Sequence, residues 1–138
     1  MNSTHATHLS SAFLIAAKRS AETRIIDERF EAALVPAIVC AAFSIELGLK
    51  SLIYKESTVE CKKEHKLGAL FEKTSPSTQN EIAKIINIPL ADLANKINLV
   101  SNAFVDWRYV YEKTSMSIDL GFLTTLAAAV ESVNKQIK

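Results

Sequence analysis

Apolar residues recur along this chain at spacings of three and four, the period of an α-helix, with little of the alternation that strands show. Only three glycines and three prolines interrupt the pattern, so the sequence predicts an all-α protein of five or six helices. Helices of this length with short connections pack as antiparallel neighbours. We therefore expect an up-and-down four-helix bundle with one or two short additional helices.

Two long helices are predicted in the first half of the chain. The first runs from about residue 3 to the mid-twenties, with its apolar residues along one side. The second starts near Leu34 and ends near Lys55, and Pro36 falls in its first turn, where proline is tolerated. Because its middle is apolar on nearly all sides, this second helix is expected to be central and the most buried.

The second half of the chain predicts shorter helices and one long one. A short helix follows a polar loop in "HKLGALFEK", and another starts at Pro76 with Ser75 as its N-cap. Pro89 separates that helix from a long one that runs to about Lys113, so the stretch "NAFVDWRYVYEKTS" (102–115) forms its last third. Its inward stripe is expected to comprise Val100, Phe104, Trp107 and Tyr111. A final helix carries the apolar residues from Leu120 to the end.

The composition limits the class of protein but does not indicate a substrate. With 138 residues, 49% of them hydrophobic, the chain fits a single domain spanning 1–138. Sixteen Lys and Arg against fifteen Asp and Glu leave a net charge of +1, so nucleic-acid binding would need a local patch. The two cysteines form no disulfide framework, which favours a reducing, cytoplasmic location.

Membrane, metal and cofactor signals are not evident in the sequence. The start "MNSTHATHLSS" lacks the basic and apolar regions of a signal peptide. The longest apolar run, 32–45, contains Pro36 and is shorter than the roughly 20 residues of a membrane span. There is no paired-Cys zinc site and no glycine-rich phosphate loop. We expect no membrane association, no metal and no cofactor.

The first candidate site is the polar face of the stretch 102–115. Arg108 and Glu112 stand four residues apart on a helix, and Tyr109 follows Arg108. Guanidinium groups match phosphate oxygens and phenol rings stack on unpaired bases, so Arg108 and Tyr109 are candidate ligand-binding residues. The alternative is a weak surface salt bridge between Arg108 and Glu112.

Two further clusters carry titratable groups. Glu46 and Lys50 stand four apart in the most apolar helix, where an unpaired charge is costly, so they form either a structural pair or part of a binding site. His65 opens the short helix after the polar loop and is a candidate acid, base or ligand, or simply a packing residue.

Taken together, these clusters resemble the HEPN domain family, the higher-eukaryote and prokaryote nucleotide-binding helical bundle. The family pattern has a central helix of the form Ala-x-x-x-x-Glu-x-x-x-Lys-x-Leu, then a His-x-Leu segment. The matching positions here are Ala41 or Ala42, Glu46, Lys50 and Leu52, then His65 and Leu67. The resemblance covers roughly residues 34 to 125 and implies the same helical bundle.

The resemblance implies RNA-related functions but leaves catalysis open. HEPN ribonucleases are metal-independent dimers with Arg, four to six intervening residues and His on the late helix. After Arg108 the matching positions hold Lys113, Thr114 and Ser115, and no His is there. These side chains do not replace an imidazole as a proton carrier near neutral pH.

Three hypotheses follow. The favoured one is a non-catalytic HEPN-like module that forms a homodimer and binds RNA, a nucleotide or a protein partner through Arg108. The resemblance implies a nucleotidyltransferase or antitoxin partner in a toxin–antitoxin or phage-defence system. The second is a divergent ribonuclease with Arg108 on the phosphate and Tyr109, Tyr111, Glu112 or His65 handling protons. The third is a structural bundle that only docks another protein.

Overall fold

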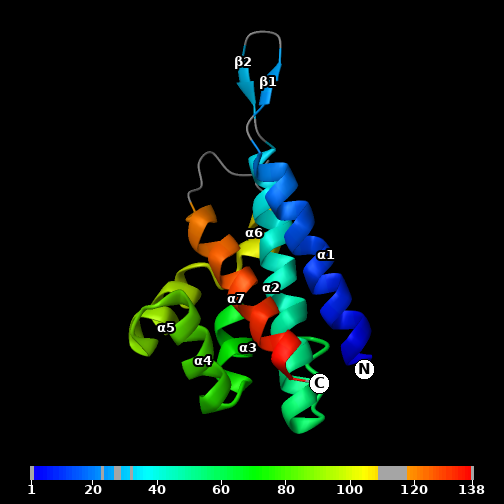
Figure 1. Ribbon diagram of the computed structural model, residues 1–138, viewed down its shortest axis with the longest axis vertical. Helices are drawn as coiled ribbons and strands as arrows, with labels where there is room; N and C mark the ends of the chain where they lie inside the picture. The colour runs from blue at the N-terminus through cyan, green and yellow to red at the C-terminus, as the bar shows by residue number, and fades with distance from the viewer. Residues whose placement is uncertain (1, 23, 27–28, 32, 109–117, 138) are drawn as a thin grey trace.

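The computed structural model describes residues 2–22, 24–26, 29–31, 33–108 and 118–137 (Figure 1). These residues form helices α1 (Ser3–Ala21), α2 (Leu34–Ser57), α3 (Leu67–Lys73), α4 (Pro76–Ile86), α5 (Leu90–Leu99), α6 (Ala103–Arg108) and α7 (Leu120–Gln136), and two short strands, β1 (Arg24–Ile26) and β2 (Arg29–Glu31). The predicted helical fold class is confirmed. The helices α3, α4 and α5 lie together on one side of α2, and α1 runs along another (Figure 1).

Helix α2 is the centre of the fold, as its pattern predicted. It packs against α1, α3, α6 and α7, and its middle residues, including Ile45 and Leu49, are fully buried. By length and composition α2 alone among the described helices could cross a membrane, and 67% of its most apolar window is buried inside the fold. The chain leaves α2 through Thr58, whose φ of 59° is left-handed.

Helices α1 and α2 form the most extensive contact in the fold, and two serines join them. The hydroxyl of Ser10 donates to the carbonyl oxygen of Ser44 at 2.6 Å, and the hydroxyl of Ser44 donates to that of Ser10 at 2.6 Å. Both serines are buried. Small side chains at this crossing let the two helix backbones approach closely while every hydroxyl keeps a partner.

The predicted start of α4 is confirmed. Ser75 is the N-cap, its hydroxyl accepts from the backbone N–H of Thr78, and Pro76 is the first helical residue. In a capping box, a side chain of the same helix would accept from the N–H group of the N-cap residue; here a side chain of another helix does so. Glu56, at the end of α2, accepts from the backbone N–H of Ser75, whereas Gln79 donates to carbonyl oxygens at the end of α3.

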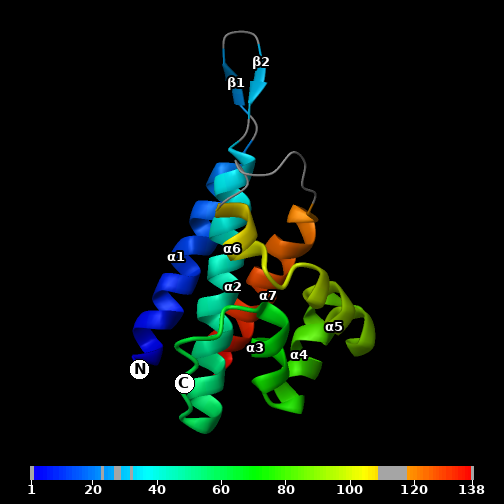
Figure 2. The same cartoon turned by 180° about the vertical axis from the view of Figure 1, so that it is seen from behind.

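Two predicted helix boundaries were wrong. The first helix does not reach the mid-twenties: α1 ends at Ala21, and β1 pairs antiparallel with β2 from Arg24 opposite Glu31 to Ile26 opposite Arg29. This hairpin projects beyond the ends of α1 and α2 in both views (Figures 1 and 2). Because β1 and β2 lie beyond the ends of α1 and α2, a helix continued there would lack the packing partners that stabilise most protein helices.

The predicted long helix from Pro89 to Lys113 is also broken. Helix α5 ends at Leu99, the chain turns at Val100–Asn102, and α6 starts at Ala103. The turn has a role that the pattern did not reveal. Ser101 accepts from the backbone N–H of Leu67 through its carbonyl oxygen and from that of Gly68 through its hydroxyl, so it caps the first turn of α3.

Candidate functional site

Glu46 is a carboxylate buried in the middle of α2. Only 2% of the residue is exposed, and the turns on either side carry fully buried apolar side chains. Lys50, one turn later on the same helix, places its Nζ 3.1 Å from Oε2 of Glu46, and 11% of the Lys50 side chain is exposed. The predicted pair therefore exists, and it is largely shielded from water, where an ion pair is less screened than at the surface.

His65 joins this pair from the segment between α2 and α3. Its Nδ1 lies 3.2 Å from Oε2 and 3.3 Å from Oε1 of Glu46, and 51% of its side chain is exposed. Residues that follow His65 help to fix its position, because the backbone N–H groups of Leu67 and Gly68 donate to Ser101. The turn that splits α5 from α6 thus also positions the histidine.

The hydrogen bond fixes the chemistry of the imidazole. Because a carboxylate only accepts, Nδ1 of His65 carries the hydrogen of this contact, and in the neutral imidazole this leaves Nε2 as an acceptor. No described residue forms a hydrogen bond with Nε2. A buried carboxylate, a lysine and a half-exposed imidazole can together hold a polar group at Nε2 or exchange a proton with it.

Arg108 lies at the end of an aromatic stack on the same side of α2. Its guanidinium is centred 4.5 Å from the ring of Phe104, one turn earlier on α6. The Phe104 ring stacks on that of Phe43 from α2, with centroids 4.6 Å apart and planes 17° from parallel. The ring of Phe13 from α1 meets Phe43 edge-on at 4.7 Å. The exposed Arg108 guanidinium thus lies over the Phe104 ring in a cation–π contact.

The stack and the Glu46 cluster follow one another along α2. Phe43 and Glu46 are three residues apart, which is less than one helical turn. In Figure 2, α6 and the segment before α3 both lie over the near face of α2. The structure therefore brings Glu46, Lys50 and His65 into contact, and the stack of Phe104 and Phe43 that carries Arg108 meets α2 three residues before Glu46.

Some predicted site residues lie elsewhere, and some site residues were missed. Tyr109, Tyr111 and Glu112 lie outside the described residues, so their predicted roles stay predictions. Phe43 and Phe104 were not predicted as parts of a site. The spacing of Phe104 and Arg108, at i and i+4, was readable from the sequence, whereas the stacking of Phe104 on a ring from another helix depends on the tertiary fold.

No cluster of three His, Cys, Asp or Glu side chains that could hold a metal ion is found within the part of the chain that the structure describes. Comparison with protein-family models, curated proteins and solved structures yields no match. The chemistry of this face is accordingly the basis for a functional assignment.

Proposed function

We propose that this protein is a HEPN-like helical module that binds single-stranded RNA through the face formed by Phe43, His65, Phe104 and Arg108. The observation that carries the proposal is the Arg108–Phe104–Phe43 stack, set one turn from a buried carboxylate that holds an imidazole at the surface. Arginine and histidine planes contact both phosphate oxygens and unstacked bases.

The charges on this face suit an anionic ligand. The carboxylate of Glu46 is buried and already accepts from Lys50 and His65, so it presents little negative charge to a phosphate. Arg108 on α6 and Lys66, which follows His65, are exposed cations. With a net charge of only +1, such a local patch is what RNA binding by this chain requires.

The finer architecture and setting belong to the same proposal. We propose that α1, α2 and α7, with α6, correspond to the four-helix bundle of HEPN domains, and that two copies form a homodimer. A nucleotidyltransferase or antitoxin partner, a role in a toxin–antitoxin or phage-defence system and a cytoplasmic location follow from the resemblance. The matched Glu46, Lys50 and His65 positions support this setting because the structure joins all three.

RNA binding is tested by fluorescence anisotropy with a labelled single-stranded oligoribonucleotide at fixed salt. Arg108→Ala is expected to weaken binding at least tenfold, because it removes both the phosphate contact and the stacking surface. Arg19→Ala, on the exposed side of α1, is the matched control and should bind as the wild type does. Wild-type protein that leaves the oligonucleotide unbound would support the purely structural hypothesis instead.

A second candidate, a metal-independent ribonuclease, is favoured by one specific contact. Glu46 holds Nδ1 of the half-exposed His65 side chain, and Nε2 of the same ring would be the general base. In that reaction Nε2 takes the proton of a ribose 2′-hydroxyl, the 2′-oxygen attacks the adjacent phosphorus, and the 5′-oxygen leaves with a proton from water. Arg108 would balance the charge on the phosphate.

Cleavage and binding are separable in one experiment. If the chain is a ribonuclease, products ending in a 2′,3′-cyclic phosphate appear, and His65→Gln abolishes them while RNA is still bound. Glu46→Gln should slow cleavage less than His65→Gln does, since it only loosens the imidazole. Intact RNA with a measurable binding curve supports the non-catalytic module.

A further inference from the structure

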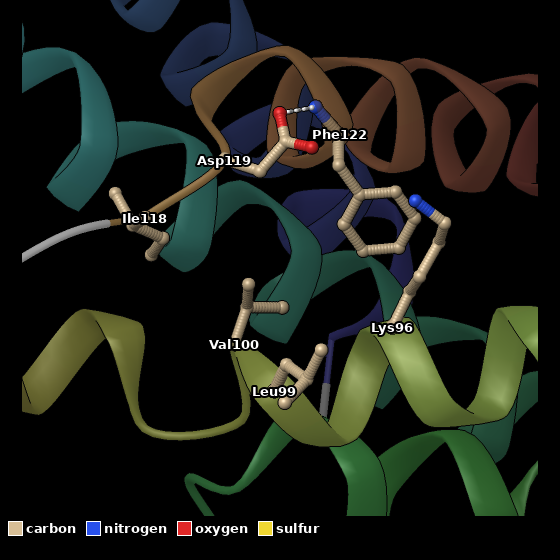
Figure 3. A pocket seen from close by; sticks show the side chains of 6 residues that line it. All are labelled: Lys96, Leu99, Val100, Ile118, Asp119 and Phe122. Atoms are coloured by element: carbon tan, nitrogen blue, oxygen red, sulfur yellow. Dashed lines mark hydrogen bonds between the residues drawn. The ribbon is translucent and has the colours of Figure 1, made fainter.

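A pocket of about 290 Å³ opens between the end of α5 and the start of α7, and it is formed by residues that the proposed RNA-binding face does not use. Its lining residues are Lys96, Leu99, Val100, Ile118, Asp119 and Phe122 (Figure 3). The volume is close to the lower end of small-molecule sites, which are mostly apolar with a few polar groups that orient the ligand.

The walls of the pocket are apolar and supported from behind by the core. Val100 and Phe122 are 6% and 9% exposed and belong to the core cluster, so their surfaces are fixed by packing. Leu99, by contrast, is 87% exposed at the rim. An isolated leucine with so much exposed surface gains from an apolar group that covers it, at about 25 cal/mol for each Å² removed from water.

The two charged groups of the pocket are not equivalent. One oxygen of Asp119 accepts from the backbone N–H of Phe122, so this carboxylate caps α7 and is stabilised by the positive end of that helix. Lys96 makes no ion pair with any described carboxylate, although Asp92 lies one turn earlier on α5. Its Nζ instead lies 5.4 Å from the centre of the Phe122 ring.

Figure 3 shows how these groups could act on one ligand. The Lys96 side chain extends along the Phe122 ring, while Leu99, Val100 and Ile118 line the remaining space below Asp119. An apolar body placed against these side chains would have its polar end beside the Lys96 ammonium. A carboxylate there would gain a charge-assisted hydrogen bond, which is stronger than a bond between neutral groups.

We propose that this pocket binds a small apolar monocarboxylate, an aromatic or branched-chain organic acid, with its carboxylate on Lys96 and its apolar body against Leu99, Val100 and Phe122. This site is independent of RNA binding, because none of its residues lies in the Phe43, His65, Phe104 and Arg108 face. A ligand there would add contacts between α5 and α7, and so would stabilise the fold.

The test uses 3-phenylpropanoate and its neutral amide as probes on the full chain, followed by two-dimensional ¹H–¹⁵N NMR. The acid should bind saturably, shift the amide signals of Val100 and Phe122, and bind about fivefold or more tightly than the amide. Lys96→Met keeps the apolar stem but removes the charge, so it should abolish the preference for the acid. Lys84→Met, on an exposed face of α4, should leave it unchanged.

Three results would overturn the proposal: no saturable binding of the acid, equal binding of acid and amide by the wild type, or a preference that survives in Lys96→Met. Lys96 is exposed, so its replacement should not unfold the protein. A second variant, Ile118→Trp, fills the pocket and should remove binding of both probes. Its affinity for RNA does not bear on this result.

Discussion

The Nδ1 atom of His65 lies 3.2 Å from Oε2 of Glu46, a contact that joins a 51% exposed imidazole to a residue that is 2% exposed. The same oxygen accepts from Lys50 at 3.1 Å. A carboxylate this deep in an apolar helix is tolerated because two donors satisfy it, and it in turn fixes the orientation of a surface group. This cluster therefore links the stability of α2 to the chemistry of its outer face.

Removal of the buried carboxylate should destabilise the protein strongly. Glu46→Ala leaves Lys50 largely shielded without its partner, and we expect a loss of about 3 kcal/mol in the free energy of unfolding, measured by urea denaturation. The i,i+4 pair Glu131–Lys135, at 3.5 Å with Lys135 66% exposed and Glu131 22% exposed, is the control, and Glu131→Ala should cost less than about 1 kcal/mol. Equal losses in the two variants would show that Glu46 contributes no more than a surface charge.

Gly48 marks a close approach between helices. A Cβ at this position would lie 2.5 Å from Cγ1 of Val130 on α7 and 3.0 Å from the hydroxyl oxygen of Ser10 on α1. Gly48→Ala should lower the unfolding free energy by about 1 to 2 kcal/mol, because overpacking outweighs the gain in helix propensity. Gly121→Ala, at the exposed Gly121 in the first turn of α7, should be neutral or slightly stabilising. The stability of both variants is measured by thermal denaturation. A stabilised Gly48→Ala protein would contradict this packing.

The serine pair should contribute cooperatively to the α1–α2 contact. Ser10→Ala and Ser44→Ala each remove one hydroxyl that donates to the carbonyl oxygen of the other serine, so each should cost about 1 kcal/mol. Because the two hydroxyl oxygens lie 3.4 Å apart, the double variant should depart from additivity in a double-mutant cycle. Ser77→Ala, exposed on α4, should leave stability unchanged. Strict additivity would mean that the two bonds form independently.

Lys55 connects the end of α2 to the end of α7. Its Nζ donates to the carbonyl oxygens of Asn134 and Ile137, at 3.2 and 3.1 Å, and to the hydroxyl of Thr7. We expect Lys55→Met to lower the unfolding free energy by about 1 to 3 kcal/mol, since these hydrogen bonds satisfy carbonyl oxygens at the end of α7. Lys18→Met, exposed on α1, is the control and should cost less than about 0.5 kcal/mol.

The same lysine predicts a direction of pH dependence. Burial lowers the pKa of the Lys55 amino group below its usual value, which is about 10.4 in an unfolded chain. Between the folded and unfolded pKa values the unfolded state binds more protons, so the contribution of Lys55 to stability rises with pH in that window. The stability difference between wild type and Lys55→Met should therefore widen as the pH rises through that window, toward pH ~10. A stability difference that narrows as the pH rises would contradict the lowered pKa of Lys55.

The aromatic stack predicts that Phe104 supports RNA binding by holding the Arg108 guanidinium. Phe104→Leu keeps most of the half-buried volume but removes the surface that supports Arg108, so RNA affinity should fall about three- to tenfold in the anisotropy assay. Phe122→Leu is the matched control, because that ring also lies beneath a cation, Lys96, but at the other pocket. If both variants bind RNA equally well, the stack is not part of the interface.

Local sequence signals predicted the elements that depend on near neighbours. The start of α4 was predicted because the Ser75 hydroxyl accepts from a first-turn N–H group and Pro76 suits the first helical position. The central position of α2 followed from its apolar residues on all sides, and the Glu46–Lys50 pair from their i,i+4 spacing. The ends of α1 and of α5 were mispredicted, because a helical pattern says little about where packing against the core stops.

The periodicity of the chain was enough to predict a helical fold built on one apolar helix with a charged pair inside it. The turn at Ser101 has its cause in another helix, because the N–H groups at the start of α3 donate to the carbonyl oxygen and hydroxyl of Ser101. That turn positions His65 against Glu46, from which it is 19 residues away in the sequence. It also lets the Phe104 ring contact both Phe43 and Arg108. Contacts between residues distant in sequence produce no periodic signal in the sequence, so the arrangement of the site could be read only from the packed helices.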